Sequence, residues 1–236
     1  MTHKSLVLSS LLILLSSSFG QERGGTDPSV ALPLLRQVLG TAHASGSIAY
    51  WGRCEALKPF PDFPALRYPS VYSGSPVEVL QRVFRPDPKM EVTQGTNGLI
   101  RMFETDVPRD FLDIKIRRVS FGAPEQSPDI FNGPNDALYA ILSTPEVKAY
   151  RIAHKIGPFS ESQYGSHGPA SKQQVSGDLY DVTMMQALDY ILQTFPGFWI
   201  YLNCQSNDGE LGRYVHFGFY KTDMSPTDRS LKEKSK

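Results

Sequence analysis

The stretch from Asp178 to Tyr220 constrains the fold of this chain most, because its elements can be read in order from turn residues and periodicity. A short strand is predicted over 178–182 and is followed by Thr183, a residue suited to cap a helix with an apolar stripe. A Pro-Gly pair ends this helix, and two strands joined by an Asn-Asp-Gly turn come next. The predicted order is therefore strand, helix, strand, strand.

The rest of the chain also alternates between helices and strands. Helices are predicted over 28–42, 76–84, 135–142 and 145–155, and strands over 47–54, 90–93, 99–104 and 111–121. A helix followed by a hairpin occurs twice, over 75–104 and 183–220, which suggests an internal repeat of this unit. We expect an α+β fold in which helices pack on one face of a mixed or antiparallel sheet.

The N-terminus has the pattern of a signal peptide. Lys4 precedes an apolar run from Leu6 to Leu15, and Ser18 and Gly20 are small residues suited to cleavage before Gln21. The apolar run is shorter than a helix that spans a bilayer. We expect residues 1–20 to be removed on export to the periplasm or the extracellular space, with no stable membrane insertion afterwards. An uncleaved N-terminal anchor is the alternative.

Composition indicates a folded, near-neutral protein after cleavage. The hydrophobic fraction of 40% excludes full disorder and a multispan membrane protein. Lys+Arg and Asp+Glu number 24 each, a balance that does not indicate a nucleic-acid binder. The expected parts are a linker over 21–27, an α+β domain over 28–220 and a disordered tail over 221–236. The loop over 122–134 allows a division into two lobes, 28–121 and 135–220.

The chain has two cysteines, Cys54 and Cys204. In an oxidising compartment an even number favours a disulfide, and two buried free thiols are the alternative. Each cysteine ends a predicted strand, so neighbouring strands would have to run parallel for the two side chains to meet. A loop of this length gives about 4–5 kcal/mol of stabilisation in the chain-entropy model. Two cysteines alone do not make a metal site, and no metal or cofactor is expected.

The two C-terminal strands are rich in aromatic residues. Strand parity places Phe198, Ile200 and Leu202 on one face, which is the expected floor for the preceding helix. The other face would carry Trp199, Tyr201, Tyr214, His216 and Tyr220. One interpretation is a stacking surface for a glycan, a peptide or a partner protein. The alternative is a second packed layer of the core.

Patterns that indicate catalysis are weak. The four histidines after residue 20 have no metalloprotease spacing. Ser166 and His167 are adjacent, and adjacent side chains rarely face each other as a nucleophile and its base must. We therefore assign no catalytic residue and favour a noncatalytic protein, with an unrecognised hydrolase as the least favoured hypothesis.

The unit over 178–220 has Val182-Thr183 before its helix, Ala187-Leu188-Asp189 inside it and a hairpin after it. In these features it resembles the small periplasmic modules of secretins and the short N-terminal domain of TonB-dependent receptors. The resemblance implies a noncatalytic α+β module that engages a protein partner in the cell envelope, and it assigns no functional residue. The segment 196–203, PGFWIYLN, is also similar to a segment of exported bacterial proteins that have no assigned activity.

Three functional hypotheses follow. The leading hypothesis is an exported noncatalytic module that binds an envelope protein through exposed sheet edges and the aromatic face. The second is binding of a glycan or small ligand on that aromatic face. The hydrolase is the third.

Overall fold

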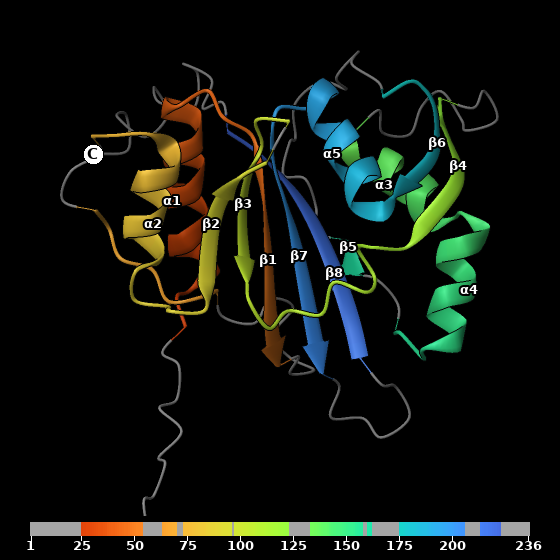
Figure 1. Ribbon diagram of the computed structural model, residues 1–236, viewed down its shortest axis with the longest axis horizontal. Helices are drawn as coiled ribbons and strands as arrows, with labels where there is room; N and C mark the ends of the chain where they lie inside the picture. The colour runs from red at the N-terminus through yellow and green to blue at the C-terminus, as the bar shows by residue number, and fades with distance from the viewer. Residues whose placement is uncertain are drawn as a thin grey trace, which may run out of the picture.

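The computed structural model describes residues 25–53, 63–69, 73–95, 97–122, 133–157, 160–161, 175–205 and 213–222. The larger sheet has six strands in the order β2-β3-β1-β7-β8-β5, and a smaller sheet pairs β4 with β6 (Figure 1). The strands are β1 (Gly46–Arg53), β2 (Met90–Gln94), β3 (Ile100–Glu104), β4 (Lys115–Phe121), β5 (Ser160–Glu161), β6 (Gly177–Thr183), β7 (Gly197–Gln205) and β8 (Arg213–Lys221). The helices are α1 (Pro28–Thr41), α2 (Pro76–Phe84), α3 (Pro134–Leu142), α4 (Pro145–Ala153) and α5 (Met184–Thr194).

The larger sheet is mixed, and β1 lies at its centre. β1 runs parallel to both of its neighbours, β3 and β7. β2 is antiparallel to β3, and β8 is antiparallel to β7, so both predicted hairpins are present. The short β5 pairs in parallel with β8 at the far edge. The α+β class and the mixed sheet are thus confirmed.

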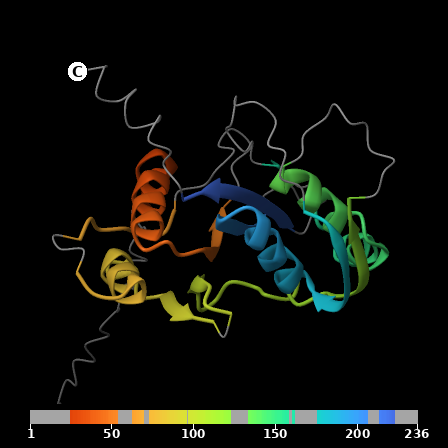
Figure 2. The same ribbon diagram turned by 90° about the horizontal axis from the view of Figure 1, so that it is seen from above.

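Helices lie on both faces of the larger sheet, whereas we expected them on one. Helices α1 and α2 cover one face, and α3, α5 and the two-stranded β4–β6 ribbon cover the other (Figures 1 and 2). Each face therefore has its own hydrophobic core. The physical reason is visible in β7, where Trp199, Ile200 and Tyr201 are consecutive and all buried. A strand that is buried on both sides lacks a polar face, so its residues do not alternate in the way that identifies a solvent-exposed side of the sheet.

Local capping signals set the helix starts as predicted. The Asp27 side chain accepts a hydrogen bond from the Ser29 N–H at 2.7 Å at the start of α1. Capping boxes begin α2, with Ser75 and Glu78, and α5, with Thr183 and Gln186. These reciprocal bonds satisfy backbone donors that the first turn of a helix leaves unpaired.

The strand predicted over 111–121 is shorter in the structure. Only Lys115–Phe121 forms β4, and residues 111–113 form a turn. The carbonyls of Leu112 and Ile114 instead accept hydrogen bonds at 2.9 Å from the first two N–H groups of α5. This segment is buried because it packs against the N-terminus of α5 and hydrogen-bonds to it. Its alternating apolar residues therefore look like those of a strand, although residues 111–113 form a turn.

The larger sheet runs across the proposed division at 122–134, since β1 and β3 precede it and β7 and β8 follow it. Both helix–hairpin units are present, as α2-β2-β3 and α5-β7-β8. They are arranged differently, because α2 and α5 lie on opposite faces of the sheet. In addition, β1 pairs with the second strand of the first unit and with the first strand of the second unit.

Several predictions fall on residues outside the described ones: the signal peptide over 1–20, Cys54 and most of the tail over 221–236. Those predictions stay open. At the described end of the expected linker, Thr26 exchanges two backbone hydrogen bonds of 2.9 Å with Phe63. Within the described ranges, no helix combines the length and the apolar character needed to cross a membrane.

Candidate functional site

The aromatic residues predicted to form one exposed face are divided between two faces. The β7–β8 hairpin pairs Trp199 with Phe219 and Tyr201 with Phe217, so Trp199 and Tyr201 share their face with the core under α5. Tyr214, His216 and Tyr220 lie opposite Cys204, Leu202 and Phe198 respectively, on the face covered by α1. The prediction was wrong because it combined even-numbered positions of one strand with odd-numbered positions of the other. A register error of one residue exchanges the two faces.

These aromatic side chains pack rather than form an open surface. Trp199 and Tyr201 are both 0% exposed, and His216 is 5% exposed. The indole Nε1–H of Trp199 donates to Asp189 Oδ1 at 3.0 Å, and the Tyr201 hydroxyl donates to the Pro108 carbonyl at 3.2 Å. The packed-layer alternative therefore describes Trp199 and Tyr201, and a glycan-stacking face is not available there.

Burial of His216 predicts a pH-dependent stability. Burial lowers the pKa of His216 to about 4, from an unfolded value near 6.5. The folded state thus favours the neutral imidazole, and this stabilisation is present above the unfolded pKa and is lost as the pH falls toward 4. We expect the free energy of unfolding to drop by about 1–2 kcal/mol between pH 7 and pH 5. Urea unfolding at both pH values measures it. An equal drop in His216→Gln would assign the effect to other groups.

A charged network that sequence reasoning missed lies beneath the middle of α5, at Asp189. Arg101 donates to Asp189 through both Nη1, at 2.7 Å, and Nη2, forming a two-pronged ion pair. The side chains are only 14% and 10% exposed. Arg101 Nη1 also donates to the Ser47 hydroxyl at 2.7 Å, and the Asn97 amide donates to Asp189 Oδ2 at 3.5 Å. With the indole bond from Trp199, both carboxylate oxygens are fully engaged, which is how a buried charge is tolerated.

Local patterns in the sequence do not reveal this network. Asp189 follows Leu188 at the flank of the apolar stripe of α5, and Arg101 stands between Ile100 and Met102 in a strand, a position that alternation assigns to the opposite, polar face. The pair forms because the fold brings α5 onto the face of the sheet that carries Arg101.

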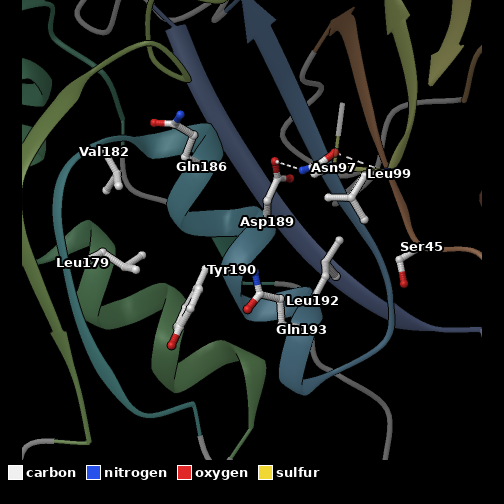
Figure 3. Close-up of a pocket in the computed structure, with 10 residues that line it drawn as sticks. All are labelled: Ser45, Asn97, Leu99, Leu179, Val182, Gln186, Asp189, Tyr190, Leu192 and Gln193. Carbon is white, nitrogen blue, oxygen red and sulfur yellow. Dashed lines mark hydrogen bonds between the residues drawn. The ribbon is translucent and has the colours of Figure 1, made fainter. Parts of the chain in front are cut away.

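A cavity of about 330 Å³ lies beside this network, along α5 (Figure 3). Its lining comes from α5, from β6, from the turn between β2 and β3, and from the residue before β1: Ser45, Asn97, Leu99, Leu179, Val182, Gln186, Asp189, Tyr190, Leu192 and Gln193. Figure 3 shows Asp189 and Asn97 pointing toward each other, joined by their hydrogen bond. Among the described lining residues only Asp189 carries a charge, and Arg101 already neutralises it, so the cavity suits an uncharged group.

A second polar cluster joins α4 and β8 to the turn before β4. Arg213 donates to both carboxylate oxygens of Asp110, at 3.0 and 2.6 Å, and the Tyr150 hydroxyl donates to the same carboxylate. Burial raises the pKa of Asp110, but the hydrogen bonds from Arg213 and Tyr150 outweigh it and hold this pKa below its usual value. Burial and the hydrogen bond to Asp110 raise the pKa of Tyr150. A tyrosine held protonated is a poor base, so we interpret the cluster as a structural clamp.

The described residues contain no group of three or more His, Cys, Asp or Glu side chains that could hold a metal ion. Ser166 and His167, considered for hydrolase chemistry, lie outside the described ranges.

Among the described residues no strand pairs with the outer side of β2, which is an open sheet edge in this part of the structure. Backbone groups of a strand point alternately to its two sides. Lys89 O and Gly95 N, at the two ends of β2, hydrogen-bond to the β3 side, so odd-numbered positions face β3. Met90, Val92 and Gln94 therefore turn their backbone N–H and C=O groups away from β3.

Two of these outward groups already have partners. The Met90 N–H donates to the Asp87 carbonyl at 3.1 Å, and the Gln81 side-chain amide of α2 donates to the Val92 carbonyl at 3.3 Å. The N–H groups of Val92 and Gln94 and the carbonyls of Met90 and Gln94 remain directed outward. The edge thus offers both donors and acceptors to a neighbouring strand.

Comparison with known proteins found no match, so the function is inferred from the geometry described above. No protein-family model matches the chain, and no curated protein or solved structure matches it.

Proposed function

We propose that this chain is an exported noncatalytic module that binds a protein partner in the cell envelope. The observation that supports this function is the open outer edge of β2, where Met90, Val92 and Gln94 direct backbone groups away from the sheet. Such an edge is a common site for binding another polypeptide. Of the residues first considered for this contact, Trp199, Tyr201 and His216 are buried, and Tyr214 and Tyr220 are half-buried on the opposite face of the hairpin from Trp199, so we assign the contact to the edge.

The edge also has features that limit uncontrolled pairing. Natural proteins shield open edges with short strands and charged side chains. β2 is five residues long, its Glu91 is exposed, and Gln81 covers the Val92 carbonyl. These features oppose random association and leave the central donors available, which is what a selective binding edge requires.

The full-length chain, tagged at its C-terminus, tests this function in intact native cells. We expect the recovered protein to begin at Gln21 and, after formaldehyde crosslinking and affinity purification, to carry a reproducible envelope protein identified by mass spectrometry. The matched control is the same chain without residues 1–20, which stays inside the cell. Retention of the full-length chain in the cytoplasm, or no protein enriched over the control, would contradict the proposal.

The cavity beside Asp189 favours a second candidate function, the binding of a small uncharged ligand. Its volume of about 330 Å³ is at the lower end of the range for small-molecule sites. Asn97, Gln186 and Gln193 contribute side-chain amides, and Leu99 contributes an apolar wall. This candidate replaces the aromatic face as the place for a glycan or small ligand. A cell-envelope experiment that yields no protein partner would bring it forward.

A further inference from the structure

We propose that the partner contacts this protein through an extended segment of alternating apolar and basic residues, which adds as a new strand to the outer edge of β2 and displaces Gln81 from the Val92 carbonyl. This inference rests on the proposed function and specifies the chemistry of the partner. It rests on three features of the edge, namely its backbone groups, the side chains on its two faces and the Gln81 contact.

The backbone groups match the hydrogen-bonding pattern of an added strand. Val92 and Gln94 are two residues apart, which is the interval at which a strand presents its N–H and C=O groups to the same side. Their outward N–H groups, with the carbonyls of Met90 and Gln94, form a row of donors and acceptors that is interrupted where Gln81 occupies the Val92 carbonyl. An extended segment can pair with this row without any change in the β2–β3 ladder.

The side chains of β2 differ on its two faces. Met90 and Val92 are buried in the core beneath α2, whereas Glu91 and Thr93 are exposed on the opposite face. Side chains of an added strand lie beside those of its neighbour on each face. Residues facing the α2 side would therefore lie beside the apolar side chains of Met90 and Val92, and residues on the other side would lie beside the exposed Glu91 carboxylate. This arrangement favours an alternation of apolar residues with lysine or arginine.

Gln81 covers the one outward carbonyl at the middle of the edge. Its amide reaches the Val92 carbonyl at 3.3 Å, near the long end of the range for a hydrogen bond. Gln81 itself is exposed on α2, so its side chain can turn into solvent when another N–H takes its place. The helix that carries it is held in position by the Ser75–Glu78 capping box. Gln81 thus covers the Val92 carbonyl, and an incoming strand must replace this hydrogen bond with one from its own backbone N–H.

The charge pattern favours a different chain over a second copy of this one. Two copies pairing antiparallel about Val92 would place Glu91 opposite Thr93, so this pairing brings no cationic side chain opposite the carboxylate, and Lys89 on the same face is already paired with Asp106. A basic segment of another protein supplies that neighbour. Pairing between two copies of this chain is therefore the alternative that the experiment must be able to detect.

The experiment uses the full-length chain in native cells with a photoreactive benzoylphenylalanine in place of Thr93. The control position is Tyr139 on α3, which is 57% exposed and lies away from the edge. Each probe is combined with Gln94→Pro, which removes one outward N–H and leaves the β3 side intact, because proline is tolerated on an edge strand. Gln94→Ala is the matched variant that keeps the N–H. Urea unfolding of each purified variant verifies that it is folded.

We expect an adduct with an envelope protein from position 93 and none from position 139. Gln94→Pro should reduce the adduct about tenfold, Gln94→Ala should preserve it, and Gln81→Ala should raise it about two- to fivefold because no bond has to be exchanged. The contacting segment, mapped by mass spectrometry, should alternate apolar and basic residues.

Other outcomes separate the two proposals. An adduct from position 139 alone, or one that Gln94→Pro leaves unchanged, would overturn strand addition and leave partner binding intact. An adduct with a second copy of this chain would overturn the assignment to a different protein. No adduct from either position, with no partner after formaldehyde crosslinking, would overturn both proposals.

Discussion

Replacing Asp189 with leucine is expected to lower the free energy of unfolding by about 3–5 kcal/mol, because it leaves the Arg101 guanidinium buried without its counter-ion. The Arg101 side chain is only 14% exposed and cannot reach water without moving. The same substitution removes the acceptor of the Trp199 indole N–H, which donates to Asp189 at 3.0 Å. Chemical unfolding of the wild-type and variant proteins in urea measures the difference.

A second substitution distinguishes the loss of a charge pair from simple overpacking of α5. In Arg101→Met combined with Asp189→Leu, both charges are absent, and buried ion pairs replaced by apolar residues are often neutral in stability. We expect this double variant to recover more than half of the stability lost in Asp189→Leu. A double variant as unstable as the sum of the two single variants would show that the two residues are not coupled.

We propose a disulfide between Cys54 and Cys204, and its reduction is expected to have an effect of similar size, about 4–5 kcal/mol in the chain-entropy model. The two cysteines can meet only if their strands are parallel neighbours, and β1 and β7 are parallel neighbours. Within this pair of strands, Gly52 lies opposite Cys204. Cys54 follows two residues after Gly52 and lies outside the described residues, so the bond itself remains a proposal. Urea unfolding with and without dithiothreitol measures the effect.

The variant that carries both Cys54→Ser and Cys204→Ser is the control. It should be as unstable as the reduced wild-type protein and should not respond to dithiothreitol. Intact mass under non-reducing conditions gives an independent readout, because the oxidised chain is lighter by two hydrogens. Two thiols that react freely in the unfolded, unreduced protein would contradict the disulfide.

The features that could be predicted from sequence are those set by neighbouring residues. Ser75 with Glu78 marked the start of α2, and the Gly-Thr-Asn-Gly turn marked the β2–β3 hairpin. Both signals work because capping and turn formation involve residues within three or four positions of each other. Helix positions and hairpin partners were therefore recovered with small boundary differences.

The features that could not be predicted depend on pairing between distant residues. Parity alone could not decide which face of β8 joins Trp199 and Tyr201, because the register of the hairpin decides it. The ion pair of Arg101 and Asp189 joins two elements 88 residues apart, so no local pattern contains both. The open edge of β2 likewise depends on which strand ends the sheet, a property of topology rather than of the strand itself.

The position of β7 in the chain has a consequence for how the protein is made. β1 ends at Arg53, but its second neighbour, β7, does not begin until Gly197, so during N-to-C synthesis the central strand waits for that partner until all the residues between them have been made. β7 also contributes Phe198 to one core and Trp199 to the other. A nascent chain that lacks β7 therefore lacks part of both cores at once. Folding of the two sides of the sheet is coupled through this one late strand.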